Sequence, residues 1–274
     1  MKVGTRLRWA LGGGAIILVL LAGIGLGRLI KGTEDDGTLE RVKATGELRV
    51  GLDASFPPFE SLDATGNVVG VDADLAHAIA TALGAEPVFV NIGFDGLYDA
   101  LLAGRVDAVI SGLPYDPLRT QDVIYSEPYF NAGQLLVVRA SDTTMTRVGT
   151  DHPPVSEYLR GRAVAVEWGS LADMEGRRLR QVSVGMQILP QPTAQEALTA
   201  LASGQADAAI ADAVSVYQFL GQDREGVHIA ATLTDEPYVI ATRMTSRQLA
   251  EAINQALAAL RESGELDQLK AKWF

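Results

Sequence analysis

The chain has 274 residues, 47% of them hydrophobic and none of them cysteine, which is enough for one large domain or two domains of ordinary size. The lack of cysteine excludes disulfide bonds, thiolate metal sites and a lipid-modified N-terminal cysteine, and the three scattered histidines predict no metal site and no cofactor. The net charge of −11 excludes nucleic acid as a partner, because an acidic surface repels phosphate.

The N-terminal segment has the pattern of a membrane anchor or an export signal. Three basic residues precede Trp9–Ile30, an apolar run long enough to cross a bilayer, and this basic flank predicts an N-terminus inside and the remainder outside. A cleaved signal peptide with a small-x-small site ending at Gly27 is the alternative. We expect residues 1–31 to be a short tail plus anchor or signal and residues 32–45 a charged linker. Both alternatives place the functional part outside the cytoplasm, in the periplasm or on the outer surface.

Strand and helix signals begin after the expected linker. Glu47–Leu52 is typical of a strand, and the following Asp53–Phe59 contains two prolines that prevent further regular pairing. A helix is expected over Asp72–Leu83, with Asp72 as its N-cap. Pro87–Val90 predicts another strand.

A unit at residues 100–112 recurs one hundred residues later. The two copies read ALLAGRVDAVISG and ALASGQADAAIAD, with six identities in register. In each copy a helix ends at a glycine suited to the left-handed cap, and an apolar run then predicts a strand buried in a parallel sheet. Ligands of open α/β sheets bind beyond the carboxyl ends of strands. The repeat therefore predicts two similar lobes sharing a cleft, although a common helix–glycine–strand unit can also recur by chance.

The second half of the chain continues the alternation and predicts a hinge architecture. Strands are expected at 134–138, 162–166 and 184–189, and helices at 170–180, 193–203, 213–220 and 246–262. Crossings between the lobes are expected near residues 133 and 237, so lobe 1 comprises 46–132 and 237–274 and lobe 2 comprises 133–236. Two lobes joined by two crossings can close around a ligand by hinge motion.

Several motifs together resemble those of the family 3 extracellular solute-binding proteins, which are polar amino-acid receptors of ABC importers. The motifs are LRVGLDASFPPFE, GVDADLAHAIATALG, ISGLPYDPLR, YSEPYF and LDQLKAKWF, and the resemblance covers about residues 46–274. It implies an α/β, two-lobed periplasmic-binding-protein-like fold of type II with two crossings. It also implies a monomeric receptor, not an enzyme, that captures an amino acid and presents it to ABC permease subunits.

The resemblance implies a ligand site as well. Arg119 matches the family's ligand arginine, whose planar fork can make two charge-assisted hydrogen bonds to an α-carboxylate, although a solvated surface charge is the alternative. Asp212 is the expected partner of the ligand ammonium, with helix capping as the alternative. Phe56 and Phe94 match positions that flank the ligand side chain, with core packing as the alternative. The remaining expected contacts are Asp53, Ser111, Gly112, Glu167, Gly169 and Ser170.

Two of these positions bear on which ligand is bound. Pro114 stands where many relatives have serine or threonine, so a hydroxyl and an N–H are missing from the expected carboxylate site. Glu167 and Asp53 would make the distal pocket acidic, which favours arginine, lysine or ornithine as ligand. If Glu167 instead paired with Arg162, a neutral polar ligand would fit.

Two alternative functions remain open from the sequence. Dehydratases of cyclohexadienyl or arogenate type resemble this family, and in such an enzyme Glu167 would be the general-acid candidate. A ligand-sensing subunit that regulates a partner is the other alternative. No nucleophile–base pair is visible in the sequence, which favours the receptor.

Overall fold

The computed structural model describes residues 35–145, 153–221 and 226–274. The expected membrane anchor or signal of residues 1–31 lies outside the described residues. Within the described ranges, no helix is both long and apolar enough to cross a membrane. All the helices and strands described below belong to one unit, Gly37–Phe274.

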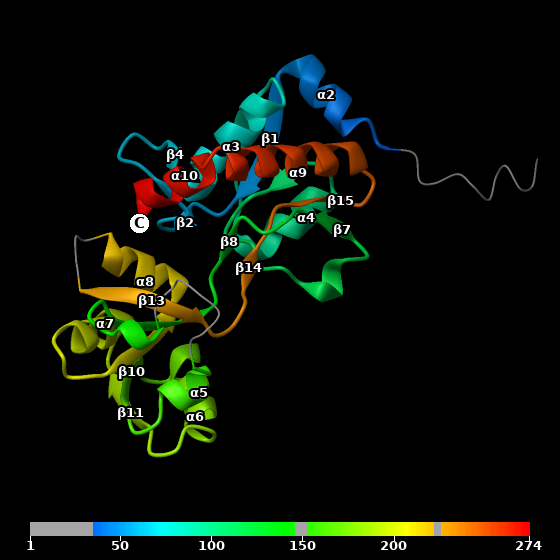
Figure 1. Cartoon of the computed structure of the whole chain (residues 1–274). Helices are drawn as coiled ribbons and strands as arrows, with labels where there is room; N and C mark the ends of the chain where they lie inside the picture. Colours follow the sequence, from blue (N-terminus) through cyan, green and yellow to red (C-terminus); the bar gives the residue numbers. More distant parts are fainter. Residues whose placement is uncertain (1–34, 146–152, 222–225) are drawn as a thin grey trace, which may run out of the picture. The chain divides into compact units, whose positions relative to one another are not determined.

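The first five-stranded sheet joins distant parts of the chain. Its order is β5 (Glu86–Asn91), β1 (Glu47–Leu52), β6 (Ala108–Val109), β15 (Ala241–Arg243) and β7 (Val123–Tyr125). β1 pairs in parallel with β5 and β6, and β15 pairs antiparallel with β6 and β7. The chain therefore returns near its end to the sheet with which it began (Figure 1).

The second five-stranded sheet has the same plan. Its order is β11 (Gln187–Gln191), β10 (Ala163–Glu167), β12 (Ala208–Asp212), β9 (Gln134–Arg139) and β13 (Val227–Thr232). β10 pairs in parallel with β11 and β12, and β9 pairs antiparallel with β12 and β13. The repeat predicted from the sequence thus supplies β6 and β12, the central strands of the two sheets. We call the first sheet with its helices lobe 1 and the second sheet with its helices lobe 2.

Two crossings connect the lobes, as the sequence predicted. One contains β8 (Phe130–Asn131) and the other β14 (Pro237–Tyr238), and the two strands pair antiparallel. The side chain of Asn131 ties the crossings together, because its Nδ2 donates to Asp235 Oδ1 at 2.7 Å and its Oδ1 accepts from the backbone N of Glu236 at 2.9 Å. We propose that the lobes divide at 132/133 and 236/237, beside this ribbon.

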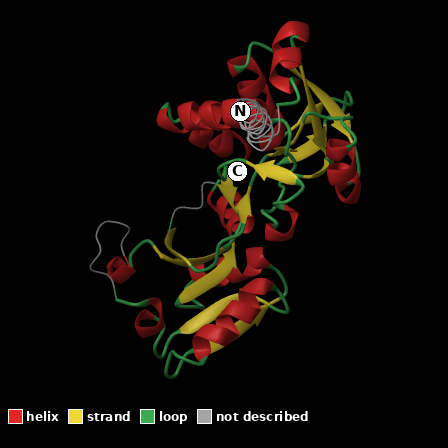
Figure 2. Cartoon of the chain, turned by 90° about the vertical axis from the view of Figure 1, so that its right-hand side faces the viewer, coloured by secondary structure: helices red, strands yellow, loops and turns green. Residues whose placement is uncertain are grey.

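Helices pack against both sheets (Figure 2). Lobe 1 contains α3 (Val71–Ala82), α4 (Leu97–Leu102), α9 (Arg247–Glu262) and α10 (Glu265–Trp273), and α10 packs on α3 and α9. Lobe 2 contains α5 (Val155–Tyr158), α6 (Leu171–Arg180), α7 (Ala194–Ala202) and α8 (Ala213–Leu220). A small sheet of β2 (Ser55–Phe56), β3 (Glu60–Leu62) and β4 (Val68–Val69) precedes α3, and short 3-10 turns lie at Phe94–Gly96, Pro117–Arg119 and Thr143–Met145. The buried side of α9 is the predicted stripe of Leu249, Ile253, Ala256, Leu257 and Leu260.

The prediction of a linker over residues 32–45 is wrong for the second half of that range. Residues Thr38–Thr45 form helix α2. Leu39 and Val42, three residues apart and on one face, are buried in the core of lobe 1. Arg243 holds the start of the helix by donating from Nη2 to Thr38 Oγ1 at 2.8 Å. This short apolar face is buried by tertiary packing, so α2 belongs to the folded lobe.

The predicted N-cap role of Asp72 is also wrong. α3 begins at Val71 with Gly70 as its N-cap, and Asp72 is fully buried inside the first turn. Gly70 has a φ of 135°, and a Cβ there would lie 2.1 Å from the carbonyl oxygen of Phe59. This close approach requires glycine before the helix, and it leaves Asp72 facing the interior.

Candidate functional site

A cavity of about 320 Å³ opens on lobe 1 beyond the carboxyl ends of β1 and β6. Its lining residues are Asp53, Ser55, Phe56, Glu60, Phe94, Gly112, Pro114 and Tyr238. The location agrees with the rule for open α/β sheets. Four of the predicted site residues, Asp53, Phe56, Phe94 and Gly112, therefore share one wall.

Asp53 organises this wall. Its Oδ2 accepts from the backbone N of Phe94 at 2.8 Å, and its Oδ1 accepts from Ser55 Oγ at 2.7 Å. Its own backbone N donates to Ser111 Oγ at 3.0 Å. The carboxylate of Asp53 thus joins the loops that carry the two predicted aromatic residues, and its backbone N–H ties them to Ser111 beyond β6. Each carboxylate oxygen has a second lone pair, so Asp53 can still accept from a ligand.

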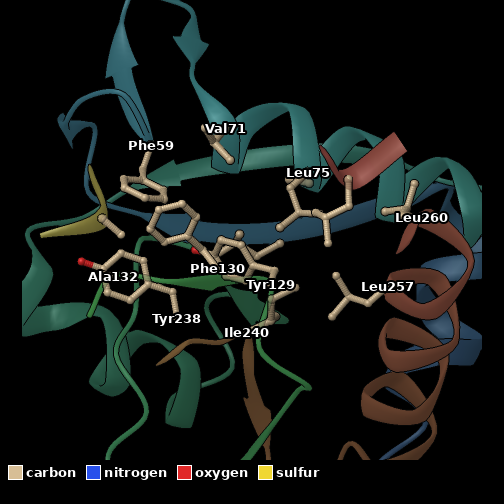
Figure 3. Close-up of a cluster of buried hydrophobic side chains, with 14 of the residues drawn as sticks. Phe59, Val71, Leu75, Tyr129, Phe130, Ala132, Tyr238, Ile240, Leu257 and Leu260 are labelled. Atoms are coloured by element: carbon tan, nitrogen blue, oxygen red, sulfur yellow. The ribbon is translucent and has the colours of Figure 1, made fainter. Parts of the chain in front are cut away.

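The two predicted aromatic residues are not core residues. Phe56 is 41% exposed and Phe94 is 45% exposed. Phe56 stacks on Phe59, with ring centroids 5.4 Å apart and planes 10° apart. Phe59 is fully buried against Phe130 and Tyr238 (Figure 3). The buried cluster therefore supports one face of Phe56 while the side chain remains half open to solvent.

The end of β6 rests on two buried carboxyl groups that the sequence analysis missed. Ser111 Oγ donates to Glu60 Oε1 at 2.7 Å, and Gly112 N donates to Asp72 Oδ2 at 2.5 Å. The hydroxyl of Tyr129 also donates to Asp72 Oδ2, at 3.0 Å. A signal for Asp72 was available, because it lies three and seven residues before Leu75 and Ile79, on the stripe predicted to be buried.

Burial governs the protonation of this cluster. The pKa of Glu60 is raised to about 10, mainly because burial removes its hydration, with further contributions from the charge and hydrogen bond of Asp72. Burial raises the pKa of Asp72 too, against the opposing hydrogen bonds from Glu60, Gly112 and Tyr129. The pKa of the Tyr129 hydroxyl lies well above its ordinary value, because of burial and the nearby carboxyl charges.

A second cavity, of about 170 Å³, lies on lobe 2 at the carboxyl ends of β10 and β12. Its lining residues are Gln134, Glu167, Ser170, Leu171, Ala172, Ala194, Ala211 and Asp212. Three predicted site residues, Glu167, Ser170 and Asp212, come together here. Gln134 is an addition: it pairs with Asp212 in the sheet, and its buried Oε1 has no partner within the described ranges.

Ser170 and Gly169 lie at the start of α6. Ser170 caps the helix, with its Oγ accepting from the backbone N of Asp173 at 3.3 Å and donating to the carbonyl of Glu167 at 2.8 Å. Gly169 has a φ of 76°, and its backbone N donates to Asp173 Oδ2 at 3.1 Å. The cap therefore holds the turn after β10 in place.

Asp212 is a helix cap, which is the alternative that the sequence left open. Its Oδ1 accepts from Ser215 N at 2.9 Å and its Oδ2 from Ser215 Oγ at 2.7 Å, at the start of α8. The carboxylate also lines the cavity of lobe 2. Capping leaves lone pairs on both oxygens, so this geometry is compatible with a bound ammonium.

Arg119 lies apart from both cavities. It ends the turn Pro117–Arg119, is exposed, and places its guanidinium 4.7 Å from the centroid of the Tyr98 ring. Pro114 does line the cavity of lobe 1, and it bridges to Tyr238 of the second crossing. Pro114, which replaces the serine or threonine of many relatives, therefore lies at the cavity wall, whereas Arg119 lies on the surface.

The structure contradicts the suggested pairing of Glu167 with Arg162. Arg162 donates from Nε to the carbonyl of Tyr158 at 2.6 Å and packs its guanidinium 4.1 Å from the centroid of that ring. Its acidic partner is Asp142, at 3.8 Å. Arg162 is thus held beside α5, and Glu167 remains at the cavity of lobe 2.

Comparisons with known proteins agree with this architecture. The model of the bacterial extracellular solute-binding proteins, family 3, matches residues 48–274. ABC transporter arginine-binding protein 1 of Escherichia coli K12 is 28% identical over 236 residues, which cover 84% of this chain and 92% of that protein.

Two solved structures are similar along most of the chain. An ancestral cationic amino acid solute-binding protein, AncCDT-1, is 32% identical with a TM-score of 0.61, covering 86% of this chain and 99% of that one. A second structure of AncCDT-1 is described as a precursor of cyclohexadienyl dehydratase. The L-cystine solute receptor of Neisseria gonorrhoeae, at 23% identity, has a TM-score of 0.70 over 86% of this chain and 95% of that one, and shows the shared fold. With its two sheets, paired crossings and matching family model, the chain belongs to the bacterial extracellular solute-binding proteins of family 3.

Proposed function

We propose that this chain is an extracytoplasmic receptor that binds an amino acid with a cationic side chain and presents it to an ABC permease. The charge of the cavity walls carries the proposal. Asp53 lines the cavity of lobe 1, and Glu167 and Asp212 line the cavity of lobe 2. Among the described residues, neither cavity is lined by a lysine or an arginine. Acidic groups that approach each other during hinge closure are stabilised by a cation between them.

Each ligand group has a candidate partner. Asp212, with Gln134 beside it, offers acceptors to the α-ammonium, while Asp53 and Glu167 offer them to the distal cation. The half-exposed ring of Phe56 can pack on the methylenes or the guanidinium of the ligand, as can Phe94. Arg119 is the candidate for the α-carboxylate, and binding would require its side chain to leave the Tyr98 ring.

The similar proteins are all named as amino-acid-binding proteins, which supports an amino acid as the ligand. The amino acid named differs from one protein to the next. Arginine is named for the Escherichia coli relative, a cationic amino acid for AncCDT-1, and L-cystine for the structure that shares only the fold. The acidic walls of this chain favour the first two. Export by the N-terminal segment and action as a monomer are part of the same proposal.

A thermal-shift screen tests the proposal. A ligand that binds only the folded protein raises its melting temperature. Arginine, lysine and ornithine are expected to raise it at concentrations where glutamate and glutamine leave it unchanged. If no amino acid raises the melting temperature, the receptor proposal is wrong.

A dehydratase is the second candidate, favoured by the likeness to AncCDT-1 as a precursor of cyclohexadienyl dehydratase. Glu167 lies at the cavity of lobe 2, where a general acid could reach a bound ring acid. We expect no turnover when the protein is incubated with prephenate-like acids. Release of the aromatic product at a rate that falls in Glu167→Gln would replace the receptor proposal with the enzyme.

A further inference from the structure

Two carboxyl groups from different elements meet behind the wall of lobe 1. Glu60 comes from β3 and Asp72 from α3, and both residues are 0% exposed. Each uses one oxygen to accept a donor at the end of β6, Ser111 Oγ for Glu60 and Gly112 N for Asp72. The pair therefore holds Gly112, which lines the cavity, and the buried Ser111 that precedes it.

The remaining oxygens of the pair require a proton. Glu60 Oε2 and Asp72 Oδ1 are buried and accept no hydrogen bond within the described ranges. The two carboxyl groups come together because they accept from the consecutive residues Ser111 and Gly112. An ionised carboxylate only accepts hydrogen bonds. Two facing carboxyl groups can hydrogen-bond only when one is protonated and donates its O–H to the other.

The groups around Glu60 and Asp72 favour the protonated form of the pair. The titratable groups that face the pair are Asp53 at the end of β1, Tyr129 before β8 and Tyr238 on β14. None of these three side chains can carry a positive charge. Two ionised carboxylates would be buried together beside a third acid, an arrangement that burial and like-charge repulsion both oppose.

We propose that Glu60 and Asp72 share a single proton at neutral pH, and that this protonated pair holds Ser111 and Gly112 in place and so positions the wall of the lobe 1 cavity. Both are positioning residues, because they act on the site through Ser111 and Gly112. Loss of the shared proton in alkaline solution would separate the pair and disturb that wall. The proton is a property of the fold, while its effect on a ligand rests on the proposed function.

The pH dependence of stability tests the shared proton without any ligand. The unfolded chain releases this proton in the ordinary range of glutamate, whereas the folded chain keeps it until alkaline pH because the pKa of Glu60 is raised. The stabilisation is therefore complete below the ordinary pKa of glutamate and is lost as pH rises through the raised one. One such proton increases the unfolding constant up to about tenfold per pH unit within that window.

Glu60→Gln is the informative variant. Its amide can accept from Ser111 and donate to Asp72, so it replaces the shared proton permanently. We expect the unfolding free energy of the variant to fall less steeply with pH than that of the wild type, by the slope that corresponds to one proton. Glu86→Gln, which alters an exposed glutamate of lobe 1, is the matched control and is expected to follow the wild type. Identical slopes for wild type and Glu60→Gln would overturn the proposal.

Infrared spectroscopy of the wild type covers the case in which Glu60→Gln does not fold. Ordinary carboxyl groups are ionised at neutral pH, so a carboxylic-acid C=O band that persists there and disappears at alkaline pH reports the buried acid. Absence of that band at neutral pH contradicts the shared proton.

Calorimetry with arginine tests the positioning role. Glu60→Met is expected to bind arginine at least tenfold more weakly than Glu60→Gln at neutral pH, since methionine offers Ser111 only a weak acceptor and cannot donate to Asp72. Wild-type affinity in a folded Glu60→Met protein would exclude the positioning role. Failure of the wild type to bind any amino acid would reject the proposed function instead, and would leave the stability and infrared results to decide on the proton.

Discussion

Asp212 caps a helix and lines a cavity, and we propose that its carboxylate also binds the ligand ammonium. Both of its oxygens accept from Ser215 at the start of α8, and the same side chain lines the cavity of lobe 2. Asparagine caps helices about as well as aspartate but carries no charge. The two roles can therefore be separated by a single substitution.

Asp212→Asn is expected to keep the melting temperature near that of the wild type and to weaken binding of an amine-bearing ligand by at least tenfold. The ligand ammonium would lose its counter-charge in an enclosed site. Calorimetry and thermal melts on the same preparations measure both effects. An unchanged affinity for the tightest amino-acid ligand would remove Asp212 from the site.

Arg119 is the residue for which sequence and structure differ most. The motif implies a ligand arginine, whereas its guanidinium lies over Tyr98 on the surface. Sequence similarity can identify the type of group that a ligand needs, but the rotamer of a long exposed side chain depends on what is bound.

Arg119→Ala is expected to abolish amino-acid binding with little change in stability, because charge-assisted hydrogen bonds contribute roughly 1.5–3 kcal/mol each. Arg119→Lys should restore little, since lysine lacks the planar fork. Arg105→Ala, at another exposed arginine of lobe 1, is the control and is expected to bind like the wild type. Wild-type calorimetric affinity in Arg119→Ala would contradict the assignment.

At the scale of elements, helix α2 is the clearest addition to what the sequence predicted. Leu39 and Val42 are buried in lobe 1, and Val42 is 0% exposed. Removing two buried methyl groups at Val42 costs both transfer free energy and a cavity. The helix therefore contributes to the stability of the lobe.

Val42→Ala is expected to lower the free energy of unfolding by about 2 kcal/mol. Glu40→Ala, at an exposed position of the same helix, should change it by less than about 0.5 kcal/mol. Chemical denaturation of the three proteins measures the difference. Equal stability of Val42→Ala and the wild type would show that α2 does not belong to the folded core.

The sequence predicted elements well where periodicity and burial agree. The repeat at residues 100–112 and 200–212 identified β6 and β12, because a helix cap, a glycine and an apolar run occur together in each copy. Elsewhere the sequence predicted a strand over 184–189, whereas the strand there, β11, is Gln187–Gln191 and contains Pro190. Proline is tolerated there because β11 is an edge strand, which no local signal reveals. Asp72 was misassigned for a similar reason: its residue type suits a cap, but tertiary packing buries it.

At the scale of the whole molecule, the acidic residues gathered at the two cavities belong to different lobes. Asp53 lies beyond β1 and Glu167 at the end of β10, and the paired strands β8 and β14 connect the lobes that carry them. The sequence anticipated both carboxylates and the two crossings. It could not anticipate the buried Glu60–Asp72 pair, because that pair forms only when β3, α3 and β6 pack together.

Competition calorimetry of arginine against glutamine and glutamate tests the central claim most directly, in the wild type and in Glu167→Gln. If both lobes present acidic groups to a distal cation, the wild type binds arginine at least tenfold more tightly than glutamine and binds glutamate most weakly. Glu167→Gln should narrow the gap between arginine and glutamine, since one counter-charge of the cation is removed. Tighter binding of glutamate than of arginine by the wild type would contradict the account.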